Sequence, residues 1–152
     1  PEIYKMVTEK FSCCPVIFHF IGDGDLREEL CSRCKDSGIN YRLWGNQHPE
    51  YMTEIINCMD LVVLPSLNEG LPLVSVETLA CGVPMVGANV GGISEVIGIE
   101  NVVNHGDSFS EKMSDLIVDK LSHPRHVCVG DDFSWHKTGE IEKHIIESLN
   151  LL

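Results

Sequence analysis

The sequence has little positive charge and no long apolar segment. Its 152 residues include 11 lysines and arginines against 23 aspartates and glutamates, which gives a formal net charge of −12. Because no lysine- and arginine-rich run is present, a surface that follows nucleic-acid phosphates is not expected. No apolar run approaches the roughly 18 residues of a membrane-spanning helix, and the first residues lack a signal-peptide pattern. We therefore expect a cytoplasmic protein.

The cysteines do not indicate a disulfide framework. They are seven, an odd number, and they are scattered through apolar segments, which favours reduced thiols. Cys31 and Cys34 have the C-x-x-C spacing of some metal and redox sites. No second pair stands at zinc-site spacing, and the motif lies inside a helical pattern. We interpret both as structural thiols and expect no bound metal.

Apolar runs typical of strands alternate with helical patterns along the chain. Its length and its 43% hydrophobic content fit one folded domain, residues 1–152. The strands are predicted at residues 15–21, 39–44, 61–64 and 83–88. The helices are predicted at residues 1–11, 25–37, 51–59, 72–81 and 109–121, with a last helix that begins at Ser134 and presents Ile141, Ile145 and Leu149. Short connections require parallel strands and right-handed crossovers, so we predict an α/β fold with a doubly wound parallel sheet.

Two glycine turns follow predicted strands. The turn Gly22-Asp23-Gly24 suggests a phosphate loop, but Arg27 occupies the third glycine of the dinucleotide fingerprint, so an NAD site is not expected. The pair Gly91-Gly92 permits either a close backbone approach to a ligand or a tight strand-to-helix turn.

The stretch from Asp60 to Glu95 organises the rest of the chain. Its strand, 61–64, is an unbroken apolar run, which predicts a central strand covered on both faces. Pro72 suits the first position of the helix that follows. Ligands bind at the carboxyl ends of strands in such folds, and free amides at a helix N-terminus favour a phosphate. The amides in question here are those of Leu71, Leu73 and Val74.

Two glutamates stand near this predicted helix start. Glu69 lies in the loop before the helix. Glu77 falls on the same helical face as Leu73, Val76 and Ala80, so we predict that its carboxylate points toward the core and meets donors there. Periodicity alone leaves an ion pair or a solvent-reaching edge position equally open.

The segment Glu69–Glu77 resembles the Glu-x7-Glu signature of retaining glycosyltransferases with the GT-B fold, family 4 (group 1) in particular. The flanking segments Pro65-Ser66, Ala80–Val86 and Gly91–Glu95 match the order and spacing of that family. The resemblance covers roughly residues 12–149. It implies a Rossmann-like, carboxy-terminal half of a GT-B enzyme, the domain that binds the sugar donor. The amino-terminal, acceptor-binding domain is not part of this sequence.

The resemblance also implies residue roles. Glu69 would face the donor sugar, the backbone from Gly70 through Leu71 and Leu73 to Val74 would hold the diphosphate, and Glu77 would bind the ribose hydroxyls. Gly22 would lie beside the donor, and Gly45 and Asn46 would border the base. The implied reaction is hexosyl transfer from a nucleoside diphosphate sugar, UDP- or GDP-linked, to an acceptor hydroxyl with retention, without a metal or other cofactor.

The usual setting of this family is polysaccharide and cell-envelope assembly, so the resemblance implies an acceptor glycan or lipid-linked sugar at the inner face of a membrane. The arginine and lysine that the family uses against the leaving diphosphate are absent here. We therefore expect the chain alone to hold a donor weakly and to transfer little or nothing. Two alternatives remain: a non-catalytic nucleotide-sugar-binding or regulatory module, and a fragment of a GT-B sugar-nucleotide epimerase.

Three other side chains, His19, Trp44 and His105, are not predicted to take part in the chemistry. His19 is interpreted as a core or strand-edge residue. Trp44 is predicted to pack in the core, with base stacking as the alternative. No chemistry is assigned to His105.

Overall fold

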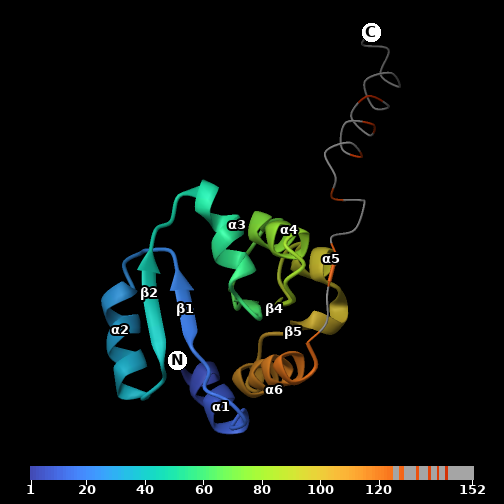
Figure 1. Cartoon of the computed structure of the whole chain (residues 1–152). Coiled ribbons are helices and arrows are strands. Elements are labelled where there is room, and N and C mark those ends of the chain that lie inside the picture. The colour runs from blue at the N-terminus through green and yellow to red at the C-terminus, as the bar shows by residue number, and fades with distance from the viewer. Residues whose placement is uncertain (125–126, 129–132, 134–136, 138–139, 141–142, 144–152) are drawn as a thin grey trace.

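The computed structural model describes residues 1–124 and, beyond them, Val127, Cys128, Phe133, Lys137, Glu140 and Lys143 (Figure 1). The residues that mark the predicted last helix, Ser134, Ile141, Ile145 and Leu149, lie outside the described residues.

Helices and strands alternate through the described part of the chain, as predicted. In order they are α1 (Glu2–Lys10), β1 (Phe18–Ile21), α2 (Arg27–Asp36), β2 (Tyr41–Gly45), α3 (Pro49–Asn57), β3 (Val62–Leu64), α4 (Leu73–Ala80), β4 (Met85–Ala88), α5 (Ile93–Ile97), the short 3-10 helix η1 (Ile99–Asn101), β5 (Val102–Val103) and α6 (Phe109–Ser122). Among the described residues, no helix has both the length and the apolar character needed to cross a membrane.

The strands are parallel, and helices cover both faces of the sheet β3-β4-β5. Neighbouring residues of β4 point to opposite faces, because side chains alternate along a strand. Val86 belongs to a core with α1 and α6, formed by Val7, Val86, Val103, Met113 and Ile117. Met85 belongs to a second core with α4 and α5, formed by Leu79, Met85, Ile93, Val96 and Ile97. This arrangement confirms the predicted doubly wound α/β class.

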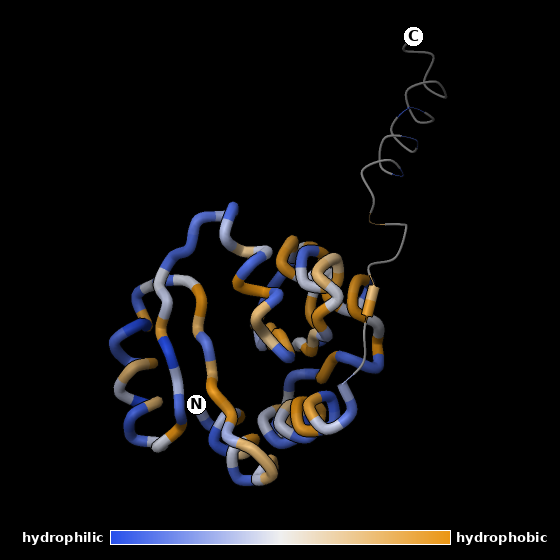
Figure 2. The backbone as a smooth tube through the Cα atoms, viewed as in Figure 1, coloured by the Kyte–Doolittle hydropathy of each residue, from blue (hydrophilic) through white to orange (hydrophobic). Residues whose placement is uncertain are grey.

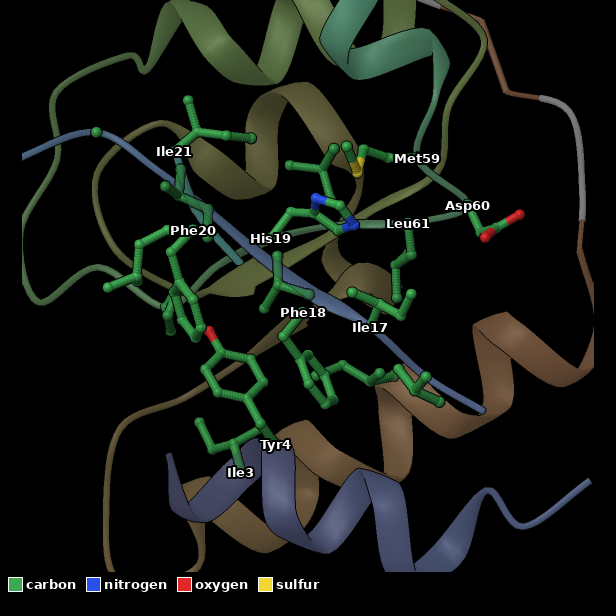
Figure 3. A pocket seen from close by; sticks show the side chains of 18 of the residues that line it. Ile3, Tyr4, Ile17, Phe18, His19, Phe20, Ile21, Met59, Asp60 and Leu61 are labelled. Carbon is green, nitrogen blue, oxygen red and sulfur yellow. The ribbon is translucent and has the colours of Figure 1, made fainter. Parts of the chain in front are cut away.

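The five strands do not form one continuous sheet. β1 pairs with β2, β3 pairs with β4, and no strand pairing joins β1 to β3 in the described part of the chain. The two strands lie on opposite sides of a cavity of about 1380 Å³, lined largely by apolar side chains such as Phe18, Phe20 and Leu61 (Figure 3). β3 is an edge strand of its sheet, so the prediction that it is central is wrong. The prediction that it is covered on both faces is confirmed, because Val63 packs on the core with α1 and α6, whereas Val62 and Leu64 pack on the core with α4 and α5. Its residues are only half-buried because its edge faces this cavity, and β4 is the fully buried strand.

Aromatic side chains of the cavity lining pack on one another where α1 meets β1. The ring of Tyr4 lies 4.7 Å from that of Phe18 and 5.3 Å from that of Phe20, measured between centroids. Burial raises the pKa of Tyr4 to about 12, because the phenolate loses solvation there.

Figure 2 shows that apolar residues are frequent in α4 and α5, whereas α2 is mostly hydrophilic. Polar contacts also tie α1 to α6. The Nζ of Lys10 donates to Ser114 Oγ at 2.9 Å and to Asp115 Oδ1 at 2.7 Å.

All seven cysteines are free thiols, including the C-x-x-C pair on α2. Cys34 is fully buried in the structure, and the Cys31 Sγ lies 3.4 Å from the hydroxyl of Tyr41. This hydrogen bond raises the pKa of Tyr41 to about 12. The described residues contain no cluster of histidine, cysteine or acidic side chains suited to a metal ion.

Candidate donor-binding site

The parallel strands β3, β4 and β5 end at the same edge of their sheet, which brings three loops together. These loops are 65–72, 89–92 and 104–108. In an open α/β fold this edge is the expected ligand site.

Glu69, the predicted sugar-facing carboxylate, lies half-buried in loop 65–72. The hydroxyl of Ser66 donates a hydrogen bond to its Oε1 at 2.7 Å. A hydrogen bond to a carboxylate is stronger than one between neutral groups, so it restrains this side chain beside the exposed residues Leu67 and Asn68.

The backbone of the same loop lies directly against Gly91 and Gly92. The Gly92 amide donates to the carbonyl of Gly70 at 2.6 Å. Gly91 has a φ of +53°, and a Cβ added there would overlap the carbonyl oxygen of Glu69 and lie 2.6 Å from that of Gly70. The close approach that these glycines permit is therefore to loop 65–72.

The start of α4 presents an open backbone. Pro72, with φ −72° and ψ 118°, is the N-cap, so the helix begins at Leu73, one residue later than predicted. No side chain of the described residues caps this end. Leu71 is 49% exposed and Leu73 is 70% exposed, and Gly70 is also on the surface. First-turn amides have no partner within their own helix, so those of Leu73 and Val74 are available to an anion.

Glu77 is exposed, and the prediction that it points toward the core is wrong. The buried face of α4 consists of Ser75, Thr78 and Leu79, whereas Leu73 and Ala80 are exposed like Glu77. Both faces contain apolar residues at helical spacing, so periodicity could not decide between them. Of the two alternatives left open, solvent is the one observed, since the Glu77 carboxylate is exposed and forms no hydrogen bond or ion pair with another side chain or main-chain group in the described ranges.

One buried polar group lies near this helix start. The hydroxyl of Ser75 is the only fully buried side-chain oxygen or nitrogen, among the described residues, that lacks a hydrogen-bond partner. Ser75 is on the core side of α4, away from the exposed face that carries Glu77.

The other predicted site residues gather at the ends of β1 and β2. The amide of Gly22, whose φ is +118°, donates to the carbonyl of Gly45 at 2.8 Å. Asp23 and Arg27 form an ion pair of 3.2 Å beside this contact. Asn46 follows on the surface. Gly22, Gly45 and Asn46 thus lie together at the ends of β1 and β2.

The cavity between β1 and β3 reaches only one predicted residue of each group: Gly22 at the ends of β1 and β2, and Val74 at the start of α4. It is lined by Gly22 at one end and by Pro65 and Val74 at the other. The remaining predicted residues of both groups, Glu69 and Glu77 included, are not among its lining.

Trp44 does not pack in the core, contrary to prediction. It is 37% exposed, its Nε1 donates to His19 Nδ1 at 2.8 Å, and the guanidinium of Arg42 lies 5.5 Å from its ring. The reason is the alternation of β2, in which Arg42 and Trp44 face outward while Tyr41 and Leu43 face inward.

His105 has a contact that sequence reasoning missed. Its Nε2 lies 3.0 Å from the carbonyl oxygen of Ser66, and its ring stacks on Phe109 with centroids 4.4 Å apart. No motif marks this histidine. Only its place, just after the last strand, could have suggested that it reaches loop 65–72.

Comparison with known proteins decides the family. A family model described as glycosyl transferases group 1 matches residues 2–121. The chain belongs to the group 1 glycosyl transferases. The chain is 28% identical over 130 residues to the D-inositol 3-phosphate glycosyltransferase of Segniliparus rotundus, and the match covers 78% of the chain and 29% of that protein.

Solved structures of larger proteins contain the same fold as this member of the group 1 family. S. aureus TarM, crystallised with Fondaparinux, alpha-GlcNAc-glycerol and UDP, matches with a TM-score of 0.67 and 20% identity, over 80% of the chain and 25% of TarM. Sucrose-phosphate synthase from Thermosynechococcus elongatus matches with a TM-score of 0.68 and 19% identity, over 97% of the chain and 43% of that protein. These matches confirm the GT-B, Rossmann-like fold. The chain spans from 20% to 29% of the length of the first curated relatives.

Proposed function

We propose that this chain is the donor-binding domain of a retaining glycosyltransferase, which transfers a hexosyl group from a nucleoside diphosphate sugar to an acceptor hydroxyl. The observation that carries the proposal is the uncapped start of α4, where the exposed residues Gly70, Leu71 and Leu73 lie between the restrained Glu69 and the exposed Glu77. Membership of the group 1 family supports it.

The geometry suits a nucleoside diphosphate in one orientation. The first-turn amides of Leu73 and Val74 and the helix dipole would bind the diphosphate. Glu77, about 6 Å farther along the axis from Leu73 at 1.5 Å per residue, would accept hydrogen bonds from the ribose hydroxyls. Glu69, before the helix, would contact the sugar.

Bond cleavage in this proposal depends on charge stabilisation. The departing diphosphate gains negative charge in the transition state, and preorganised amides aimed at it lower the barrier. The acidic protein opposes this charge, so cations elsewhere in the intact protein would complete the site. The bound UDP of TarM supports a UDP-linked donor, with GDP as the alternative.

The acceptor would bind to another part of the intact protein. We propose a glycan or lipid-linked sugar as acceptor, and a cytoplasmic site of action at the inner face of a membrane. The family and its usual setting are the support for this part.

Calorimetric titration of the full-length protein with UDP, GDP and ADP tests donor binding. We expect one nucleotide to bind, and Glu77→Ala to weaken it by roughly 1–3 kcal/mol, the scale of a lost hydrogen bond to a charged group. Glu111→Ala removes an exposed glutamate from the first turn of α6 and serves as the matched control, with unchanged affinity. Failure of all three nucleotides to bind, or equal affinity in the Glu77 variant, would contradict the proposal.

Retention needs a separate test. The anomeric configuration of the product, read by NMR from the coupling of its anomeric proton, should equal that of the donor sugar. An inverted product would rule out the retaining mechanism while leaving donor binding intact.

A further inference from the structure

The three loops at the carboxyl edge are tied to one another in a closed ring of hydrogen bonds. Loop 89–92 contacts loop 65–72 through the Gly92 amide and the Gly70 carbonyl, at 2.6 Å. It contacts loop 104–108 through Asn89 Nδ2 and Asn104 Oδ1, at 2.7 Å. The third side of the ring is the contact between His105 and Ser66 at 3.0 Å.

The bond between His105 and Ser66 has a fixed direction. The carbonyl of Ser66 can only accept, so the Nε2 of His105 must carry the donated hydrogen. The neutral Nε2–H tautomer and the protonated ring can both supply it.

The ring of His105 is anchored from behind. It stacks on Phe109 with an interplanar angle of 26°, and Phe109 packs on the core formed by Val7, Val86 and Met113. His105 is exposed, so stacking on a residue of the packed body is what restrains its orientation.

Ser66 connects His105 to Glu69, because it forms a hydrogen bond with each of them. Its carbonyl accepts from His105 while its hydroxyl donates to the Glu69 carboxylate at 2.7 Å. The connection therefore runs from the core through Phe109, His105 and Ser66 to the carboxylate proposed to face the sugar.

We propose that His105 is a positioning residue for Glu69, which holds loop 65–72 in the geometry that the donor requires. This inference rests on the proposed function. His105 contacts the loop and not the donor, so its effect is on the arrangement of Glu69 and the start of α4.

The first arm of the test uses the ligand-free full-length protein. NMR relaxation should show lower order parameters for the Glu69 and Gly70 amides in His105→Ala, because the loop loses one of its two ties. His105→Gln should restore them, since the glutamine amide can donate from nearly the same place as Nε2. His123→Ala, which removes an exposed histidine from the far end of α6, should leave them unchanged.

The second arm measures the affinity for whichever of UDP, GDP and ADP binds the wild-type protein. A net hydrogen bond of about 0.5–1.5 kcal/mol corresponds to a roughly 2- to 12-fold weakening in His105→Ala. Ser66→Ala should weaken binding too, and the double variant should fall short of the product of the single effects, because both act through one connection.

The outcomes separate the two proposals. Unchanged loop order and affinity in His105→Ala, with a wild-type protein that binds a nucleotide, would overturn the role of His105 and leave donor binding standing. Equal losses in His105→Ala and His123→Ala, or no recovery in His105→Gln, would also overturn it. A wild-type protein that binds none of the three nucleotides would contradict the proposed function. The order parameters of loop 65–72 would then still show whether His105 restrains that loop.

Discussion

At the scale of single residues, the conformation of loop 65–72 depends on Gly91, which packs against it. Gly91 leaves room for the carbonyls of Glu69 and Gly70 only because it has no Cβ. Its positive φ adds a second requirement for glycine. The position of Glu69 therefore depends on a residue of another loop.

Gly91→Ala should displace loop 65–72 and lower the free energy of unfolding by about 1–3 kcal/mol, the cost of strained backbone and overlap with main-chain atoms that cannot rotate away. Chemical denaturation measures it. Gly24→Ala is the matched control, because no atom lies within 4 Å of a Cβ added there and its φ is unstrained. Equal stability of the two variants would contradict the close packing of the loops.

The pKa of Tyr4 is raised from its ordinary 10.0 to about 12, which predicts that the protein loses stability at alkaline pH. The phenol ionises in the unfolded chain before it ionises in the folded one. Its contribution to stability is therefore fully present below pH 10 and lost as the pH rises from 10 toward 12. Tyr4→Phe keeps the ring but has no proton to lose. The difference in unfolding free energy between the two proteins, measured from pH 9 to 12, should shift in favour of Tyr4→Phe. A constant difference would show that Tyr4 is not buried from solvent.

Candidate site residues could be selected from the sequence only where a motif marked them. Glu69 and Glu77 stood out by their spacing and flanks. His105 did not, because its contact spans residues far apart in the sequence. Trp44 was misplaced since a tryptophan at the end of a strand says nothing about which face of that strand is covered.

At the scale of elements, α4 shows which face of a short apolar helix is buried. Leu79 is 7% exposed and Leu73 is 70% exposed, although both are leucines of the same helix. The exposed face is the one that carries Glu77 toward the proposed donor.

Leu79→Ala should lower the free energy of unfolding by about 2–5 kcal/mol, as expected for a buried leucine, and Leu73→Ala by no more than about 0.5 kcal/mol. Thermal or urea denaturation measures both. A larger loss in Leu73→Ala than in Leu79→Ala would mean that the opposite face of α4 is buried and that Glu77 points inward.

The order and type of the longer elements followed from the sequence, because strand runs and helical patterns alternate and glycines and prolines separate them. The short elements α5, η1 and β5 were not predicted, since five residues or fewer do not establish a period. The face of α4 did not follow from the sequence either, since its apolar residues are spread around the whole circumference. The start of α4 was predicted at Pro72 and lies at Leu73, a difference of one residue that is ordinary for a helix end.

At the scale of the whole molecule, the doubly wound class was predictable, whereas the division of the strands into two sheets was not. Strand order depends on which edges pair, and β1 and β3 face each other across a cavity without pairing. Nothing in the apolar runs of these strands distinguishes a paired edge from an open one.

Hydrogen exchange tests this division. The amides of β1 and β3 that face the cavity should exchange faster than those of β4, which is paired on both sides. Protection across β1 and β3 equal to that of β4 would show that the two sheets are joined in solution.

The most direct measurement is an experimental structure of the full-length protein with UDP bound. The account predicts the diphosphate on the amides of Leu73 and Val74, the ribose hydroxyls on Glu77, and loop 65–72 in its present contact with Gly92 and His105. A nucleotide bound away from the start of α4, or a ribose without contact to Glu77, would contradict it.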